Sequence, residues 1–475
     1  MGPETTLRRN AAIISARVGS LTLLLDPASD EMVELNPVAA VIWARLDAPR
    51  SFSSLADSLK STFDVEASEY ERDLAGIIEQ LIGLGFVEMV HPSTGSRPMP
   101  IRPVRPNNVE THSLDDQPEF TPEFRLCLAC CRWDFDEGNL DQVVALARAV
   151  SWPKFARLTR YHRIRGLVWN CLSGCESLLP PSEALAMASD AMDIAATNLR
   201  AIAMSRELIN EFDRRGLATP LFIKGLSTST LAYSNPMAKM AWDIDLLIAP
   251  SELAEAAALL EDRGYRLAVP SSRPALGKWH SREKESVWHK DRPDLPIELH
   301  TRLADHSRII PTITVQSPRQ EAEVMPGFSL PTLADSELFA YLTVHGASSA
   351  WFRLKWISDL AGFLHRKTGP EIEALYDAAL QLGAGRAPGQ ALLLADSLFG
   401  SLNDAPALRS RLQSTRTIRL LSEAALALVS GEPLEPTERL LGTWTIHWTQ
   451  LLMLPGIRFA SSEAWRQATK VMRGH

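Results

Sequence analysis

Two aspartates, Asp243 and Asp245, stand one residue apart in an apolar, β-branched run from Trp242 to Ile248. On a β-strand, side chains at i and i+2 leave the same face, so both carboxylates would point the same way. Carboxylates this close repel each other unless a cation neutralises them. Mg²⁺ prefers such oxygen ligands and keeps positions open for substrate phosphates. The pair alone is weak evidence for a metal site, because a solvated strand end has the same letters.

Two further features lie on either side of this pair. Before it, a short apolar run leads into Lys224-Gly225, and a helix could begin near Ser227. Glycine allows close backbone approach, and the free N–H groups at a helix start attract anions. After it, Glu298 stands alone between apolar neighbours. If this stretch is a strand of the same sheet, Glu298 would add a third carboxylate to the pair. Three such acids can hold two ions that activate an attacking oxygen and stabilise a leaving pyrophosphate, which favours phosphoryl or nucleotidyl transfer.

Short elements must position these acids. Residues 252–263 read as a helix that Gly264 ends, and residues 265–269 and 285–289 read as strands. The stretch around Glu298 reads as another strand. We therefore expect an α+β fold with more than one domain, in which a mixed sheet carries the acids and helices surround it.

Several motifs of this region occur in the order found in the nucleotidyltransferase-like proteins of the polymerase-β superfamily. They are Lys224-Gly225, Tyr233-Ser-Asn-Pro236, Asp243-Ile-Asp245, Gly264-Tyr265 and Glu298-Leu-His300. The chain resembles a largely uncharacterised bacterial branch of that superfamily over residues 120–400. The superfamily usually has Gly-Gly or Gly-Ser at the turn, whereas this chain, like its branch, has Lys-Gly.

The resemblance implies an Mg²⁺-dependent enzyme, with two ions, that uses a nucleoside triphosphate (NTP). The implied catalytic and metal-binding residues are Asp243, Asp245 and Glu298, and the implied nucleotide-binding residues are Lys224, Gly225, Ser227, Lys239, Lys355 and Asp359. Lys239 stands where the branch tends to carry arginine, so the charge is kept but the bidentate fork is lost. Lys355 and Asp359 are spaced to pair on one helix face, as a structural ion pair or as pocket residues.

The first 90 residues have a different pattern. Residues 11–18, 21–25 and 31–35 read as strands, with a hairpin signal at Gly19-Ser20, and helices follow from Pro37, over 54–63 and over 68–84. Three strands before three helices predict a small winged-helix-like unit.

This unit resembles the peptide-binding family typified by the small chaperone of pyrroloquinoline-quinone biosynthesis. The residues that carry the likeness are Leu35-Asn36, Ala39, Ile42-Trp43, Ile77, Leu81 and Gly85-Phe86-Val87. The resemblance implies recognition of the leader segment of a ribosomally made precursor peptide. We expect the peptide to add a strand to the edge formed by residues 31–35 and to rest on the third helix. The expected contacts are Met32, Val33, Glu34, Leu35, Leu74 and Ile78.

Two other interpretations of this unit were considered, and one of them stays open. It could be a structural domain without a ligand. A DNA-binding role is disfavoured, because the third helix carries four acids against one arginine, Arg72.

Composition limits the alternatives further. The 475 residues are 45% hydrophobic and 22% charged, as in ordinary globular proteins, and the formal net charge of -8 argues against broad nucleic-acid or membrane-surface binding. No signal peptide and no apolar run of roughly 18 residues is present, so we expect a cytoplasmic protein. The five cysteines include Cys127-x-x-Cys130, for which burial in a helix is favoured over zinc. The basic segment Arg160–Arg165 could be a solvated helix face or a phosphate contact.

The chain divides into five expected regions. They are a peptide-recognition unit at 1–90, a proline-rich linker at 91–122, a helical region at 123–218, a nucleotidyltransferase core at 219–335 and a helical C-terminal region at 336–475. These regions predict a nucleotidyltransferase that acts on a precursor peptide or its product. Two rivals stay open: a non-catalytic adaptor whose second unit binds nucleotide or serves as a scaffold, and a small-molecule nucleotidyltransferase of the antibiotic-inactivating kind.

Overall fold

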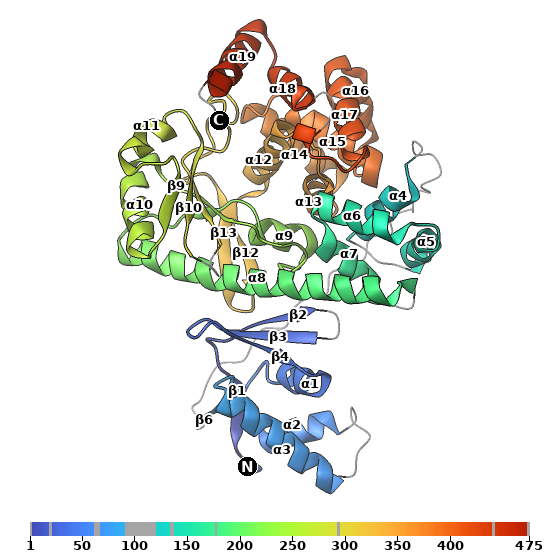
Figure 1. The fold of residues 1–475 in the computed structure, drawn as a ribbon, viewed down its shortest axis with the longest axis vertical. Coiled ribbons are helices and arrows are strands. Elements are labelled where there is room, and N and C mark those ends of the chain that lie inside the picture. The colour runs from blue at the N-terminus through green and yellow to red at the C-terminus, as the bar shows by residue number, and fades with distance from the viewer. Residues whose placement is uncertain are drawn as a thin grey trace. The chain divides into compact units, whose positions relative to one another are not determined.

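The computed structural model describes residues 2–18, 21–60, 67–90, 120–133, 137–175, 178–291, 295–438 and 442–472. They belong to two units, one within residues 1–111 and the other within residues 112–475 (Figure 1). The division falls inside the segment expected to be a linker, most of which, like the expected turn at 19–20, lies outside the described residues. The predicted α+β, multidomain fold class is confirmed.

The first unit contains the three strands and three helices expected from the sequence, together with a second sheet. Its elements are β1 (Thr6–Arg9), β2 (Ile14–Val18), β3 (Leu21–Asp26), β4 (Glu31–Leu35), α1 (Pro37–Arg45), β5 (Arg50–Ser51), α2 (Phe52–Leu59), α3 (Ala67–Gly83) and β6 (Val87–Val90). One antiparallel sheet has the order β2-β3-β4, and a second has the order β5-β1-β6. Strand β4 is therefore at a sheet edge.

Local chemistry explains how α1 begins after β4. The side chain of Asn36 accepts a hydrogen bond of 2.8 Å from the backbone N–H of Ala39, and Pro37 occupies the first turn, where no donor is needed. The helix then buries Ile42 and Trp43 in the core of the unit.

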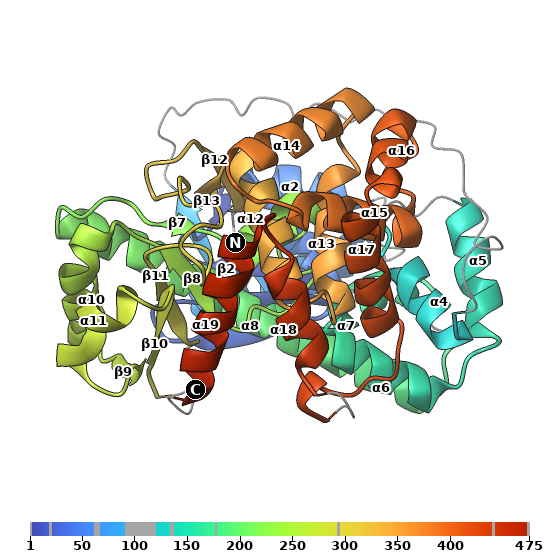
Figure 2. The ribbon, with the colours of Figure 1, turned by 90° about the horizontal axis from the view of Figure 1, so that it is seen from above.

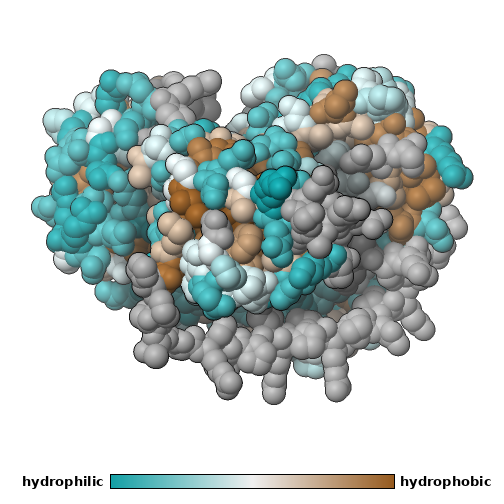
Figure 3. Space-filling view, turned by 90° about the horizontal axis from the view of Figure 1, so that it is seen from below, coloured by the Kyte–Doolittle hydropathy of each residue, from teal (hydrophilic) through white to brown (hydrophobic). Residues whose placement is uncertain are grey.

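Seen from below, the surface of the molecule mixes apolar patches into hydrophilic areas (Figure 3).

The second unit starts with five helices. They are α4 (Pro122–Cys130), α5 (Glu137–Ala147), α6 (Trp152–His162), α7 (Arg165–Leu172) and the long α8 (Pro181–Arg214). Cys127, Cys130 and Cys131, at the end of α4, are buried free thiols. Burial raises the pKa of all three, the Cys131 thiol to about 12, so they act as apolar core residues, as the sequence favoured.

A mixed five-stranded sheet follows, in the order β7-β8-β11-β10-β9. Its strands and the elements between and after them are β7 (Leu221–Phe222), α9 (Leu226–Tyr233), β8 (Ile244–Leu247), α10 (Leu253–Asp262), β9 (Arg266–Val269), α11 (Leu276–His280), β10 (Glu285–His289), β11 (Ile297–His300), and the hairpin β12 (Arg319–Met325) and β13 (Phe328–Leu333). Strands β8 and β11 are parallel, with Asp245 opposite Glu298. The sheet thus brings together two acids that are far apart in sequence.

Helices make up most of the rest of the chain. They are α12 (Asp335–Ser348), α13 (Leu354–Leu364), α14 (Gly369–Gln381), α15 (Ala387–Phe399), α16 (Pro406–Ser414), α17 (Arg416–Val429), α18 (Trp444–Leu451) and α19 (Ile457–Met472). Seen from above, α19 is drawn to the right of β8, β10 and β11 (Figure 2). Among the described helices, none has the length and apolar character to cross a membrane.

Candidate functional site

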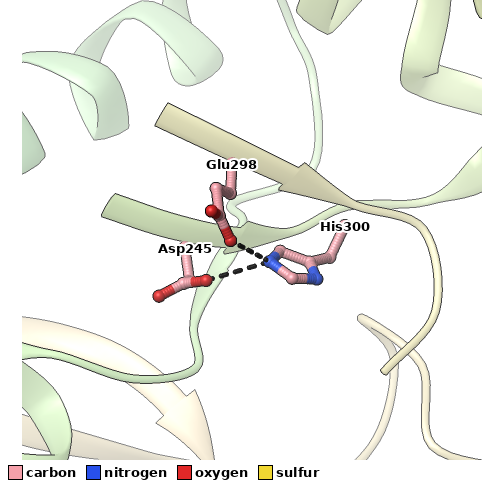
Figure 4. A group of neighbouring side chains, drawn as sticks. All are labelled: Asp245, Glu298 and His300. Carbon is pink, nitrogen blue, oxygen red and sulfur yellow. Dashed lines mark hydrogen bonds and ion pairs between the residues drawn. The ribbon is translucent and has the colours of Figure 1, made fainter. Parts of the chain in front are cut away.

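The centre of the candidate site is a group of three side chains from the two parallel strands. Asp245 comes from β8, and Glu298 and His300 come from β11, with one ligand atom of each within 4.8 Å of the others (Figure 4). His300 Nε2 lies 2.9 Å from Asp245 Oδ1 and 3.5 Å from Glu298 Oε2. The Asp245 and His300 side chains are 1% exposed, whereas that of Glu298 is 19% exposed. Glu298 therefore lies on the accessible side of the group.

The imidazole of His300 is surrounded by carboxylates. Burial alone would lower the pKa of His300, but its hydrogen bonds with Asp245 and Glu298 raise it above its ordinary value. Its other nitrogen, Nδ1, lies 3.4 Å from Glu285 Oε2 without making a well-directed hydrogen bond. The raised pKa favours the protonated ring, whose charge would balance part of the negative charge of the group when no metal is bound.

Lys224, at the end of the turn after β7, approaches the same aspartate. Its Nζ lies 2.8 Å from Asp245 Oδ1. Burial would lower the pKa of Lys224, but Asp245 and the neighbouring acids raise it well above its ordinary value, so the lysine stays charged. Lys224 and His300 thus both contact Oδ1, while Asp245 Oδ2 is buried and has no hydrogen-bond partner.

The unpartnered Oδ2 of Asp245 is the structural test for a metal site. A buried carboxylate oxygen without a partner is costly unless something absent from the protein chain satisfies it. Together with Glu298, it offers oxygen ligands of the kind that Mg²⁺ uses. His300 adds a nitrogen that suits transition metals better. The residues present therefore fit a divalent cation.

Asp243 borders this group without belonging to it. It immediately precedes β8 and is half-buried, and the group within 4.8 Å that the described residues form includes Asp245, Glu298 and His300 but not Asp243. Burial, and then the charge of Asp245, raise the pKa of Asp243 to about 7. The structure thus brings together two of the three expected acids, and the sequence analysis missed His300, whose motif it had quoted.

The turn before α9 has the predicted glycine geometry. Gly225 caps the helix with φ 67° and ψ −120°, a conformation that residues with a side chain rarely adopt. Ser227 was expected near the start of a helix whose free N–H groups would face an anion. Its hydroxyl is buried and donates to the carbonyl of Phe222 at 2.8 Å and to that of Lys224 at 3.2 Å. Ser227 therefore holds the turn in shape, and its side chain is not free to bind phosphate.

Lys355 and Asp359 on α13, which the sequence spacing would allow to pair, do not form an ion pair with each other. Asp359 does not pair with Lys355, four residues before it: it contacts the ammonium of Lys239 and accepts a hydrogen bond of 3.0 Å from the Tyr233 hydroxyl. In the part of the chain that the structure describes, Lys355 has no ion-pair partner. Burial, followed by the charges of Lys239 and Arg163, lowers the pKa of Lys355 to about 7.

Arg163 and Trp242 are two neighbours of the site that the sequence did not assign to it. The Arg163 guanidinium lies over the Trp242 ring, 4.8 Å from its centre, and Trp242 remains 47% exposed beside Asp243. The charge of Asp243 acts on the pKa of Arg163, although burial and Arg353 lower that pKa overall. The basic segment 160–165 was the available signal in the sequence.

The predicted peptide contacts of the first unit divide into two groups. Met32 and Val33 on β4 are half-buried at the sheet edge, Glu34 is exposed, and Leu35 is buried. By contrast, Leu74 and Ile78 on α3 are 3% and 0% exposed within the core of the unit. A peptide cannot reach Leu74 or Ile78 without opening that core. The partly exposed apolar residues of the same helix, Ala75, Ile77 and Ile82, are the better candidates.

The fold and the site define the class of protein. A mixed sheet with clustered acids on adjacent parallel strands, beside a lysine-glycine turn, is the arrangement expected of a nucleotidyltransferase. Residues 148–400, more than half of the chain, match the family described as "Uncharacterised nucleotidyltransferase", and the chain belongs to that family. Residues 22–87 match the family described as "Coenzyme PQQ synthesis protein D (PqqD)". No curated protein and no solved structure matches the chain.

The different environments of Lys239 and Lys355 lead to a stability prediction. Lys239→Met should lower the free energy of unfolding by about 3 kcal/mol or more, because it leaves Asp359 buried without its cation. Lys355→Met should leave stability unchanged or raise it, because it removes a buried charge that has no partner. Urea unfolding of both variants at one pH measures the difference. Equal losses would contradict the assignment of partners.

The backbone of Gly225 leads to a second prediction. Gly225→Ala should cost about 1–3 kcal/mol through backbone strain, although its Cβ would meet only a carbonyl oxygen of Asp243 at 3.9 Å. The matched control is Gly277→Ala on α11, where φ is not positive and nothing lies within 4 Å of the added Cβ. We expect thermal unfolding to show a loss for the first variant only. A Gly225→Ala protein as stable as the control would refute the strain.

Proposed function

We propose that the second unit transfers a nucleoside monophosphate from an NTP to an acceptor hydroxyl or phosphate, with Mg²⁺ bound at the acidic group. We further propose that the acceptor is a precursor peptide, or its modified product, which the first unit holds. The observation that carries the proposal is the pairing of Asp245 and Glu298 on parallel strands, with a buried Asp245 oxygen left unpartnered, inside the segment that matches a nucleotidyltransferase family.

The proposed reaction is a single displacement at phosphorus. The acceptor oxygen attacks the α-phosphorus and loses its proton, while the bond from the α-phosphorus to the bridging oxygen breaks and pyrophosphate leaves. Bound divalent ions would polarise the phosphate oxygens and stabilise the departing pyrophosphate. Asp245 and Glu298 would hold such an ion. Asp243 is the best candidate for accepting the proton, because a pKa of about 7 suits a general base near neutral pH.

Cations without a partner would balance the triphosphate. Neither Lys355 nor Arg163 forms an ion pair among the described residues, and the two are close enough for the charge of Arg163 to lower the pKa of Lys355. Lys224 adds charge beside the metal site, and the Gly225 turn lets the backbone approach the phosphates. Lys239 serves instead to neutralise Asp359. We propose that the exposed ring of Trp242 borders the bound nucleotide.

The first unit would bind the peptide by strand addition. Strand β4 is at the edge of the sheet β2-β3-β4, so every second backbone N–H and C=O along it faces away from β3. An extended peptide would satisfy these groups, and Met32 and Val33 would contact its side chains. A leader held in this way raises the local concentration of the segment to be modified.

One observation favours the non-catalytic adaptor as a second candidate. Lys224 and His300 already neutralise Asp245 without a metal. A domain in which these two cations replace the ion could bind nucleotide as a scaffold while the first unit delivers peptide to another enzyme. This candidate predicts NTP binding that does not depend on a divalent cation.

A substitution of Glu298 separates the two candidates. If Glu298 helps to hold an ion in the transition state, Glu298→Gln should lower turnover by about 100-fold or more and change nucleotide affinity far less. Pyrophosphate release measures turnover, and titration calorimetry with a nonhydrolysable NTP, with and without Mg²⁺, measures affinity. Glu321→Gln, an exposed glutamate on β12, is the control. Mg²⁺-independent affinity together with no turnover in the wild-type protein would support the adaptor.

Hydrogen exchange tests the peptide site. Binding of the leader half of a precursor peptide encoded nearby should slow exchange at alternate amides of β4 by about tenfold or more, because only alternate N–H groups face the open edge. Strand β2 is at the opposite edge of the same sheet and is the internal control. Mass spectrometry with residue-level fragmentation of the full-length protein resolves the pattern. Unchanged exchange in β4, or protection of β2 instead, would leave strand addition at β4 without support.

A further inference from the structure

A cavity of about 290 Å³ lies between α19 and the segments that flank β10 and β11. Its charged lining residues are Arg282, Glu283, Arg302, Asp305, Arg466 and Lys470. The exposed indole of Trp465 lies at its edge, with an exposed fraction of 69%. This volume is just below the range for small-molecule sites, about 300–1,000 Å³, so the cavity suits one charged group on a small carrier.

The cavity is adjacent to the acidic group along both strands. Glu283 precedes Glu285, whose carboxylate is 3.4 Å from His300 Nδ1, by two residues. On the other strand, Arg302 follows His300 by two residues and donates to the carbonyl of His280 at 3.1 Å. Two residues of chain span at most about 7 Å. A group bound in the cavity would therefore lie beside the proposed transfer site.

The charges of the cavity favour an anion. Four of the six charged lining residues are cations, in a protein whose formal net charge is -8. Two of the cations are engaged, since Arg302 donates to backbone carbonyls and Arg466 binds Glu463 through two nitrogens at 2.7 and 2.8 Å. The Lys470 ammonium is only loosely paired, 4.0 Å from Glu283. Arg282 is exposed and forms no ion pair within the described residues, so it is available to a ligand.

One wall of the cavity does not belong to the matched nucleotidyltransferase segment. That segment ends at residue 400, whereas α19 runs from Ile457 to Met472. The helix is attached to the sheet side by a hydrogen bond of 2.9 Å between His306 and Ser462. Because α19 lies outside the segment that matches the family, the cavity suits a function specific to this chain, such as selection of the acceptor. Binding of the nucleotide, which family members would share, is expected to depend on residues inside that segment.

We propose that this cavity binds an anionic group, a phosphate or a carboxylate, of the acceptor and places the acceptor beside Asp245 and Glu298. The inference rests on the proposed nucleotidyl transfer and names the chemistry of the acceptor for that same site. Arg282 and Lys470 bind the anion, and Trp465 contacts the adjacent apolar part of the acceptor. Binding of the anion itself requires neither the nucleotide nor a metal.

The test uses the full-length protein and three small probes. Phenyl phosphate and benzoate carry the two candidate anions on the same ring, and phenol is the neutral control. Titration calorimetry should show saturable binding of at least one anion and none of phenol. The double variant Arg282→Ala/Lys470→Ala should weaken that binding by about tenfold or more, because it removes two charge-assisted contacts. The stronger-binding anion identifies whether phosphate or carboxylate is preferred.

Two further variants determine where the anion binds. Arg458→Ala removes a charge from an exposed position on α19 that does not line the cavity, and it should leave the affinity unchanged. Lys355→Ala reports binding at the nucleotide site instead. Absence of saturable binding would overturn the proposal. So would a loss of affinity in Lys355→Ala that the double variant does not share.

Binding of a nonhydrolysable NTP with Mg²⁺, measured on the same samples, separates this inference from the proposed function. If the NTP binds and neither anion does, the cavity proposal fails while nucleotidyl transfer stands. If an anion binds through Arg282 and Lys470 but the NTP does not, the transfer proposal fails, and the role in acceptor selection falls with it. If both bind, and the double variant raises the KM for the acceptor without changing NTP affinity, the inference is supported.

Discussion

The second unit is built around one buried carboxylate. Burial alone would raise the pKa of Asp245, but Lys224 and His300 hold it well below its ordinary value, so the group stays ionised in the interior. Each partner comes from a different element: Lys224 from the turn after β7, and His300 from the end of β11. A buried charge that loses its partner is strongly destabilising. The ionised aspartate therefore requires that the turn, β8 and β11 be held together, which is also the requirement for a transfer site.

The cations around the site divide into two groups, those that form an ion pair and those that do not. Lys239 is committed to Asp359, and with the Tyr233 hydroxyl this pair links α9 to α13. Lys355 and Arg163, by contrast, have no ion-pair partner among the described residues, and burial followed by the charges of Lys239 and Arg163 lowers the pKa of Lys355. Unpaired buried charge lowers the stability of the protein without ligand. A polyanion such as a triphosphate would relieve this cost, which is why we propose that the phosphates bind at these cations.

The sequence predicted the features that depend on local pattern. The strand that carries Asp245, the Lys-Gly turn and the strand 31–35 follow from apolar runs, glycine geometry and alternation, and the structure contains each of them, although Asp243 lies just before its strand. The misses depend on tertiary contacts. The spacing of Lys355 and Asp359 permits a pair, but Lys239 reaches Asp359 from a distant segment and takes its place. The second small sheet was also missed, because β1 is short and pairs with β6 about eighty residues later.

Each unit has a set of polar groups at a defined place that is available to a ligand. At β4 it is a row of backbone groups on an edge strand, which folded proteins normally protect. In the second unit it is Oδ2 of Asp245 together with the unpaired cations nearby. The proposed partner is an extended peptide in the first case and a metal with phosphates in the second. Because a peptide strand cannot satisfy a buried carboxylate and a nucleotide cannot complete a sheet, the proposal requires a separate ligand for each site. A reaction that joins those ligands is the simplest reason for both to occur in one chain.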